Sequence, residues 1–210
     1  MLVYLKRMSI KNKIKMLSYF PLAFILCFSL FVISETYEKV NHLQGVKEVL
    51  ILDTKISLLL HETQKERGAT AGFLGSKGTK FADILGKQRE LTNEKYEDFV
   101  KLLNTINDDK LPENSKNHID TVLKEFSKLN DIRREVDSLK IEAKKAIGYY
   151  TDINAYLLNF IGLSSSLATN EDIFTHSIGY YNFLMAKERT GIERAVGTNA
   201  FASKTFAPGM

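Results

Sequence analysis

Apolar side chains recur at three- and four-residue intervals along nearly the whole chain, which is the spacing of helices with one buried face. From Val46 the pattern runs on through Ile56 and Leu60 and meets no strong helix-stop signal before the sequence GSKGT at 75–79. No alternating run of Val, Ile and Thr of the kind that forms strands interrupts it. The pattern therefore predicts an all-α protein.

A second helix is expected over 80–107, because its apolar positions repeat with the helical period. The sequence NDDKLPENS at 107–115 is the clearest loop in the chain. Two further helical stretches, 113–139 and 142–168, have neither Gly nor Pro between them and are expected to run on as one helix.

The last helix is expected to begin after Thr169 or Asn170, either of which is a suitable N-cap, with acidic residues favourable in its first turn. With the two merged stretches counted as one, four long helices joined by short links follow residue 34. This arrangement predicts an antiparallel four-helix bundle.

The run LSYFPLAFILCFSLFVIS at 17–34 has eighteen residues without a charge, near the lower limit for crossing a bilayer core. Residues 1–16 carry five basic side chains and no acid, which by the positive-inside rule places the N-terminus in the cytoplasm. We therefore expect a cytoplasmic basic segment 1–16, a transmembrane helix 17–34, and an extracytoplasmic helical sensor domain 35–210 that is incomplete at its C-terminus. A cleavable signal peptide is the alternative, disfavoured because the apolar run is longer than a usual signal core.

Charge and reactive side chains argue against an enzyme and against a nucleic-acid partner. The net charge of +4 comes from the basic segment 1–16, and the rest of the chain is close to neutral. The only cysteine, Cys27, lies in the apolar run, and the four histidines are scattered without a metal-binding spacing. We expect no catalytic residue, no metal site and no cofactor.

The sequence KERGATAGFLGSKG at 65–78 places Arg67 on the apolar stripe, two helical turns from both Leu60 and Leu74. A buried arginine needs an anion or hydrogen-bond acceptors, because burying it unpaired costs several kcal/mol. Gly68 and the small residues after it would let another helix or a small ligand approach. The alternative interpretation is an internal ion pair between Arg67 and either Glu188 or Glu193.

The sequence KERTGIERAVG at 187–197 nearly repeats the first motif and places Arg194 between two glycines, Gly191 and Gly197, with Arg189 as a competing candidate. Guanidinium groups match planar oxyanions because two parallel N–H donors fit two oxygens. Arg67 and Arg194 are therefore expected to hold one small anion between two helices. Glu66 and Glu193, each directly before one arginine, are expected to orient or neutralise it in the absence of the anion.

These motifs, together with KFADILGKQRELTN at 80–93 and MAKERTGIERAVGTNAF at 185–201, resemble the nitrate- and nitrite-sensing (NIT) domain of bacterial signalling proteins. The resemblance covers about 46–210. It implies a helical domain, extracytoplasmic or occasionally cytoplasmic, linked to chemotaxis-receptor, histidine-kinase, cyclase or RNA-binding antiterminator outputs. It also implies that the ligand-binding arginines are Arg67 and Arg194, and that the domain continues beyond residue 210.

The leading expectation is thus the ligand-sensing part of a chemoreceptor-like receptor of the inner membrane, with the bulk of the chain periplasmic. It would bind nitrate or nitrite, form a homodimer and pass the signal inward through its long first helix. Two alternatives stay open: a structural or protein-interaction bundle with an internal Arg–Glu pair, and a receptor for a carboxylate or amino acid.

Overall fold

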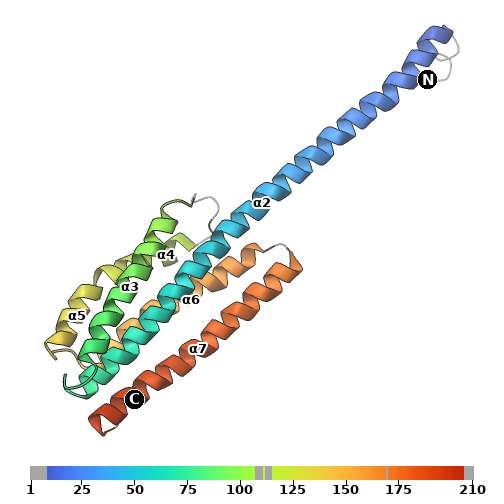
Figure 1. Cartoon of the computed structure of the whole chain (residues 1–210). Helices are drawn as coiled ribbons and strands as arrows, with labels where there is room; N and C mark the ends of the chain where they lie inside the picture. Colours follow the sequence, from blue (N-terminus) through green and yellow to red (C-terminus); the bar gives the residue numbers. More distant parts are fainter. Residues whose placement is uncertain (1–8, 107–110, 112–114, 169, 206–210) are drawn as a thin grey trace. The chain divides into compact units, whose positions relative to one another are not determined.

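The structure is a computed structural model that describes residues 9–106, 111, 115–168 and 170–205. The regular structure in these ranges is entirely helical, and the prediction of an all-α protein is confirmed (Figure 1). The elements in chain order are α2 (Ile10–Gly75), α3 (Ala82–Leu103), α4 (Ser115–Ser127), α5 (Leu129–Asp137), α6 (Ala143–Ser164), the 3-10 helix η2 (Ser165–Leu167) and α7 (Glu171–Ser203).

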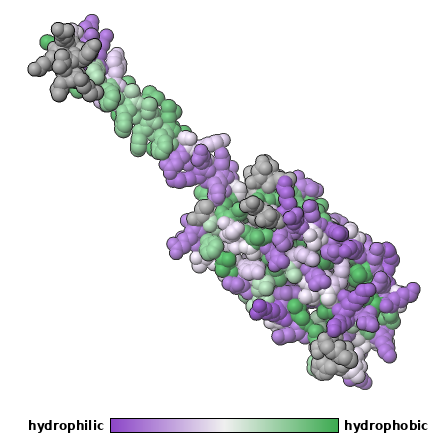
Figure 2. All heavy atoms as spheres, turned by 180° about the vertical axis from the view of Figure 1, so that it is seen from behind, coloured by the Kyte–Doolittle hydropathy of each residue, from purple (hydrophilic) through white to green (hydrophobic). Residues whose placement is uncertain are grey.

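The chain divides into two units, residues 1–45 and 46–210. In the first unit the described residues belong almost entirely to the N-terminal part of α2, and their side chains are exposed, including the large apolar ones. Figure 2 shows these apolar side chains as a band on this part of the helix. Within α2 an 18-residue window has a mean hydropathy of 2.3, which by length and composition is enough to cross a membrane. Signal sequences near an N-terminus satisfy the same criterion.

The second unit is built from helical segments that alternate in direction. Figure 1 shows α3, the α4–α5 pair, α6 and α7 each running opposite to the segment before it. Their apolar faces meet in one core that draws on every one of these helices and on the C-terminal part of α2. Its most deeply buried members include Leu52, Ile56, Leu59, Leu60, Phe99, Val122, Tyr150, Ile153, Leu157, Phe160 and Leu184.

The prediction that 113–139 and 142–168 form one helix is wrong. The first stretch breaks at Lys128 into α4 and α5, and the chain then reverses between Asp137 and Ala143. The reversal is closed by Leu139, whose φ is 55°, and by a hydrogen bond from Lys140 N to Glu135 O at 2.9 Å. This is the helix ending that usually uses glycine at the left-handed position. The described residues of the second unit therefore contain five helical segments of alternating direction instead of four.

The other expected boundaries lie close to those observed. The predicted helix 80–107 is α3, which begins after Phe81 and ends at Leu103. Asn170 caps α7, because its side chain accepts hydrogen bonds from the backbone N–H groups of Asp172 and Ile173. The alternative cap Thr169 and most of the predicted loop 107–115 lie outside the described residues.

Candidate functional site

Arg67 of α2 is completely buried and forms an ion pair with Glu188 of α7, here called the Arg67 pair. Arg67 Nη1 donates to Glu188 Oε1 at 2.5 Å, and Nη2 donates to Oε2 at 3.1 Å. Nη1 also donates to the hydroxyl of Thr151 on α6 at 3.0 Å. The two ends of the guanidinium are thus bound by one carboxylate in the bidentate geometry that makes such pairs strong.

Glu188 is held by two further side chains. Gln64 Nε2 donates to its Oε2 at 2.7 Å, and Asn154 Nδ2 lies 3.4 and 3.3 Å from its two oxygens. Asn154 is itself positioned by Thr63, whose hydroxyl donates to Asn154 Oδ1 at 2.6 Å. The Arg67 pair is therefore embedded in a polar layer shared by α2, α6 and α7.

Of the glycines Gly68, Gly191 and Gly197, predicted to give space around the arginines, only Gly191 lies against a guanidinium in the structure. A Cβ atom at Gly191 would lie 2.8 Å from Arg67 Nη2, so any side chain there would displace the guanidinium. A Cβ atom at Gly68 would meet nothing within 4 Å, so close approach to another helix does not require glycine at that position. The supporting role of Gly68 therefore stays a prediction.

Arg194 lies on the exposed side of α7 and lines a surface pocket of about 660 Å³. The lining contains four basic residues and no acidic one, and we call it the basic pocket. It is formed by His61, Gln64, Lys65, Phe183, Ala186, Lys187, Thr190, Gly191 and Arg194. A concave surface with this excess of positive charge attracts small anions.

The basic groups of this pocket lower the pKa values of one another. Lys187 Nζ lies 3.0 Å from His61 Nδ1. Burial lowers the pKa of His61, and the positive charge of Lys187 lowers it further. Burial also lowers the pKa of Lys187, with a contribution from Arg194. A bound anion would relieve this mutual repulsion.

The basic pocket adjoins the Arg67 pair although Arg67 is not part of its lining. Gln64 lines the pocket and donates to Glu188, while Gly191 lines the pocket and lies against Arg67. The structure thus brings the two predicted arginines to the same part of the α2–α7 contact. Arg67 faces it from the interior and Arg194 from the surface.

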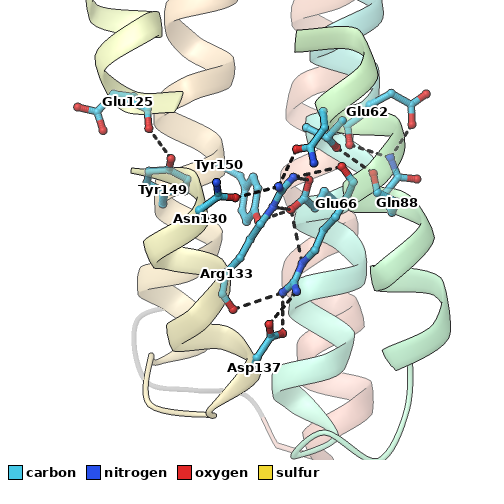
Figure 3. Close-up of polar contacts among 12 residues, drawn as sticks. Glu62, Glu66, Gln88, Glu125, Asn130, Arg133, Asp137, Tyr149 and Tyr150 are labelled. Atoms are coloured by element: carbon cyan, nitrogen blue, oxygen red, sulfur yellow. Dashed lines mark hydrogen bonds and ion pairs between the residues drawn. The ribbon is translucent and has the colours of Figure 1, made fainter. Parts of the chain in front are cut away.

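The prediction that Glu66 orients or neutralises Arg67 is not met in the structure, because the Glu66 side chain points to other helices. Arg133 of α5 donates from Nε to Glu66 Oε1 at 2.7 Å and from Nη2 to Oε2 at 2.8 Å. The hydroxyl of Tyr150 on α6 donates to Glu66 Oε1 at 2.8 Å, and Arg89 of α3 lies 3.9 Å from the same oxygen. We call these four residues the Glu66 network (Figure 3).

Burial and the charge of Glu66 both shift the pKa values of its neighbours Arg133 and Tyr150. Burial lowers the pKa of Arg133, but the hydrogen bonds and the charge of Glu66 outweigh burial and raise it overall. Burial and Glu66 together raise the pKa of Tyr150. Arg133 therefore stays charged and Tyr150 stays a hydrogen-bond donor.

Glu193, the second residue expected to orient an arginine, is exposed, and so is the competing candidate Arg189. Neither touches the Arg67 pair, because α7 turns these two positions toward solvent while Glu188 faces α2. Of the two partners that the sequence left open for Arg67, the structure selects Glu188.

Arg133 was not singled out from the sequence, yet its position carried a signal. It lies four residues after the buried Leu129 and three before the buried Val136, so it shares their face of α5. The polar residues Gln64 and Asn154 carried no comparable signal. Within the described ranges no cluster of three or more His, Cys, Asp or Glu residues is placed to hold a metal ion.

Comparison with known proteins adds three findings. The family model for nitrate and nitrite sensing (NIT) matches residues 58–210, which include both arginine motifs. A curated relative, the nitrate regulatory protein of Klebsiella oxytoca, is 28% identical over 153 residues, which are 73% of this chain and 38% of the relative. The solved structure of the NasR transcription antiterminator superposes with a TM-score of 0.76 at 26% identity, over 87% of this chain and 49% of that one.

These relatives correct the prediction of a chemoreceptor-like receptor in the inner membrane with a periplasmic sensor domain. They are a regulatory protein and a transcription antiterminator, so the chemotaxis, receptor and membrane assignments are wrong. That prediction gave too much weight to the apolar run, whose length and composition satisfy a criterion that signal sequences meet as well. The expectation that nucleic acid plays no part also conflicts with a relative that acts in transcription.

The chain spans less than half of the length of either relative, and the family model covers most of the chain. The match runs through the Arg67 pair, the basic pocket and the Glu66 network. The chain belongs to the nitrate- and nitrite-sensing (NIT) family.

Proposed function

We propose that this chain is the nitrate- or nitrite-sensing part of a regulatory protein and that it binds the anion without converting it. The observation that carries the proposal is a fully buried arginine, Arg67, lying against a glycine that also lines a pocket rich in basic residues. The family match over 58–210 supports nitrate or nitrite as the ligand.

In this proposal Arg67 and Arg194 are the two ligand-binding residues. Arg67 supplies a planar pair of donors, one of which also donates to the hydroxyl of Thr151. Arg194 approaches the anion from the pocket side. Gly191 supplies the space between them. Lys187 and His61 contribute positive potential that draws the anion into the pocket.

We further propose a division of labour among the helices. The C-terminal part of α2, α3, the α4–α5 pair and α6 act as an antiparallel four-helix bundle around Glu66, whose partners come from α3, α5 and α6. Helix α7 is the fifth segment and carries Glu188, Gly191 and Arg194. A ligand bound at this site would then act on the contact of one helix with the bundle.

The output proposed here is control of transcription, because one relative is a transcription antiterminator and another a nitrate regulatory protein. Assembly as a homodimer stays a prediction. Sedimentation of the chain with and without nitrate would test it, and a single monomeric species in both conditions would contradict it.

The rival function is a structural bundle in which the Arg67 pair only closes the core, and the observed contact with Glu188 is the observation in its favour. Isothermal titration of nitrate, nitrite, acetate and chloride into the full chain separates the two. We expect heat from nitrate or nitrite, little from acetate and none beyond dilution from chloride. No heat from any of the four would support the structural function.

The matched variants are Arg194→Ala and Arg189→Ala, which remove the same charge from the same helix. Arg194→Ala should weaken binding by about 1 kcal/mol, the upper range for an exposed charge contact. Arg189→Ala should bind like the parent, because Arg189 is exposed and lies outside the pocket lining. Equal affinities of the two variants would remove Arg194 from the site.

A further inference from the structure

Nη1 and Nη2 of Arg67, one of the donor pairs that suit a bidentate anion, are already bound by Glu188, while Arg67 Nε is buried with no hydrogen-bond partner among the described residues. Nη1 and Nη2 each donate to one oxygen of this carboxylate, and the carboxylate is also held by Gln64 and Asn154. A carboxylate is a planar, delocalised oxyanion, as nitrate and nitrite are, so it satisfies the same donors in the same geometry. One pair of donors does not hold both partners in this way at once.

We propose that Glu188 is an internal competitor of the anion, which holds Arg67 in the ligand-free protein and must release it before nitrate binds there. The proposal rests on nitrate or nitrite sensing as the function of the site. The anion reaches the pair where Gln64 and Gly191 line the basic pocket, because these residues touch both the pocket and the pair.

Charge balance supports an exchange over a simple addition. In the structure one buried cation faces one buried carboxylate. An anion added beside them would place two negative charges against one buried guanidinium, because Arg194 is exposed and not buried with the pair, and this is costly. When the anion takes the place of Glu188, the released carboxylate can turn toward the basic pocket, where the neighbouring Lys187 already feels its charge.

The exchange would give the ligand a means of acting on the fold. The Arg67 pair joins α2 to α7, and Glu188 lies one helical turn before Gly191 on α7. Breaking the pair changes how these two helices are held together. A ligand shifts a conformational equilibrium only through such a difference in contacts between its two states.

The test is Glu188→Gln in the full chain, measured by titration calorimetry with nitrate and by thermal unfolding. The amide keeps the shape of the side chain and loses the charge that competes with the anion. We expect nitrate to bind at least about tenfold more tightly. The state in which residue 188 occupies Arg67 is weakened, so a larger share of the molecules is competent to bind nitrate. We also expect a lower melting temperature without nitrate and a larger rise on adding it.

Glu171→Gln is the matched control, since Glu171 is an exposed acid on the same helix and its loss changes the net charge equally. Its nitrate affinity should equal that of the parent. If Glu188→Gln does not fold without nitrate, Glu188→Asp takes its place, because a side chain shorter by one methylene reaches Arg67 less well. Glu188→Asp should also bind nitrate more tightly than the parent, by a smaller factor than Glu188→Gln.

The inference is overturned if the Glu188 variant binds nitrate no more tightly than the Glu171 variant while its melting temperature falls. That result is what a purely structural ion pair gives. It is distinguishable from failure of the proposed function, in which neither the parent nor either variant responds to nitrate beyond its response to chloride.

Discussion

Two neighbouring residues of one helix, Glu66 and Arg67, are both completely buried, but they face different surroundings. Glu66 is bound by Arg133 through two hydrogen bonds and by Tyr150 through a third, with Arg89 close by (Figure 3). Arg67 is bound by one acid, Glu188, whose own partner Gln64 lines an open pocket.

The difference teaches how one helix carries both a fixed and an exchangeable charge. The Glu66 network draws on three other helices, and because Arg89 also pairs with Asp137, its two arginines are balanced by two acids without an added anion. The Arg67 pair has one acid for one arginine and adjoins a pocket lined by four basic residues and no acid, of which Lys65 pairs with Glu62 outside the lining. A small anion therefore competes at Arg67 and not at Glu66.

The largest effect is expected from Arg133→Met, which leaves Glu66 buried with only the more distant Arg89 as a cation. Removing one partner of a buried ion pair costs about 3–5 kcal/mol, so the free energy of unfolding should fall by that order. Denaturant unfolding with and without nitrate measures it, and the difference between the variant and the parent should be the same in both conditions.

Arg134→Met is its control, because Arg134 is the adjacent residue and its side chain is 74% exposed. The free energy of unfolding should change by no more than about 0.5 kcal/mol. If nitrate stabilised Arg133→Met less than it stabilises the parent, the Glu66 network would take part in the ligand site and the comparison would be reversed.

Compared with Arg133→Met, Arg67→Lys is expected to lose less stability and more nitrate affinity. The charge is kept, but the two parallel donors that match a planar oxyanion are lost. Nitrate binding should weaken by about 2–5 kcal/mol, measured by titration calorimetry. A lysine variant with parental affinity would show that Arg67 does not contact the anion.

Much of this arrangement could be predicted from the sequence, since the all-helical fold and the burial of Arg67 follow from apolar residues at helical spacing. The reversal before α6 could not be predicted. Leu139 has a positive φ, a backbone conformation in which glycine is the usual residue, and no glycine marks this position in the sequence. The partner of Glu66 depends on how α5 packs against α2, which one sequence does not state, although Arg133 lies on an apolar face.

The next effect concerns the space beside Arg67. Gly191→Ala places a methyl group 2.8 Å from Arg67 Nη2, and the buried guanidinium must move to admit it. Overpacking of this kind costs about 1–3 kcal/mol, and nitrate affinity should fall in parallel because the donors are displaced. Unfolding and calorimetry measure both.

Gly197→Ala is the matched control six residues further along α7, where a Cβ atom would meet nothing within 4 Å. It should raise the free energy of unfolding by about 0.5–1 kcal/mol, the ordinary gain of alanine over glycine in a helix. Similar losses in the two variants would mean that Gly191 has no special relation to Arg67.

The smallest effect is expected from pH. Burial and Lys187 lower the pKa of His61 in the folded chain, so the unfolded chain takes up this proton first as the pH falls. The ligand-free protein should therefore lose some stability as the pH falls through about 6.5. Bound nitrate adds a negative charge to the pocket and raises the pKa of His61, so its affinity should increase a few-fold over the same range.

His61→Gln should remove this pH dependence of nitrate affinity without removing binding. Lys65, Lys187, Arg194 and Glu62 also act electrostatically on His61. A pH dependence that persists in the variant would assign it to another group.

The most direct test of the account is a crystal structure of the chain grown with nitrate and compared with one grown with chloride. With nitrate, we expect the anion against the guanidinium of Arg67, Arg194 turned toward it, and the Glu188 carboxylate withdrawn. The hydrogen bonds between Glu66 and Arg133 should be the same in both crystals. A nitrate crystal in which Glu188 still binds both Nη atoms of Arg67 and the anion lies elsewhere would contradict the account.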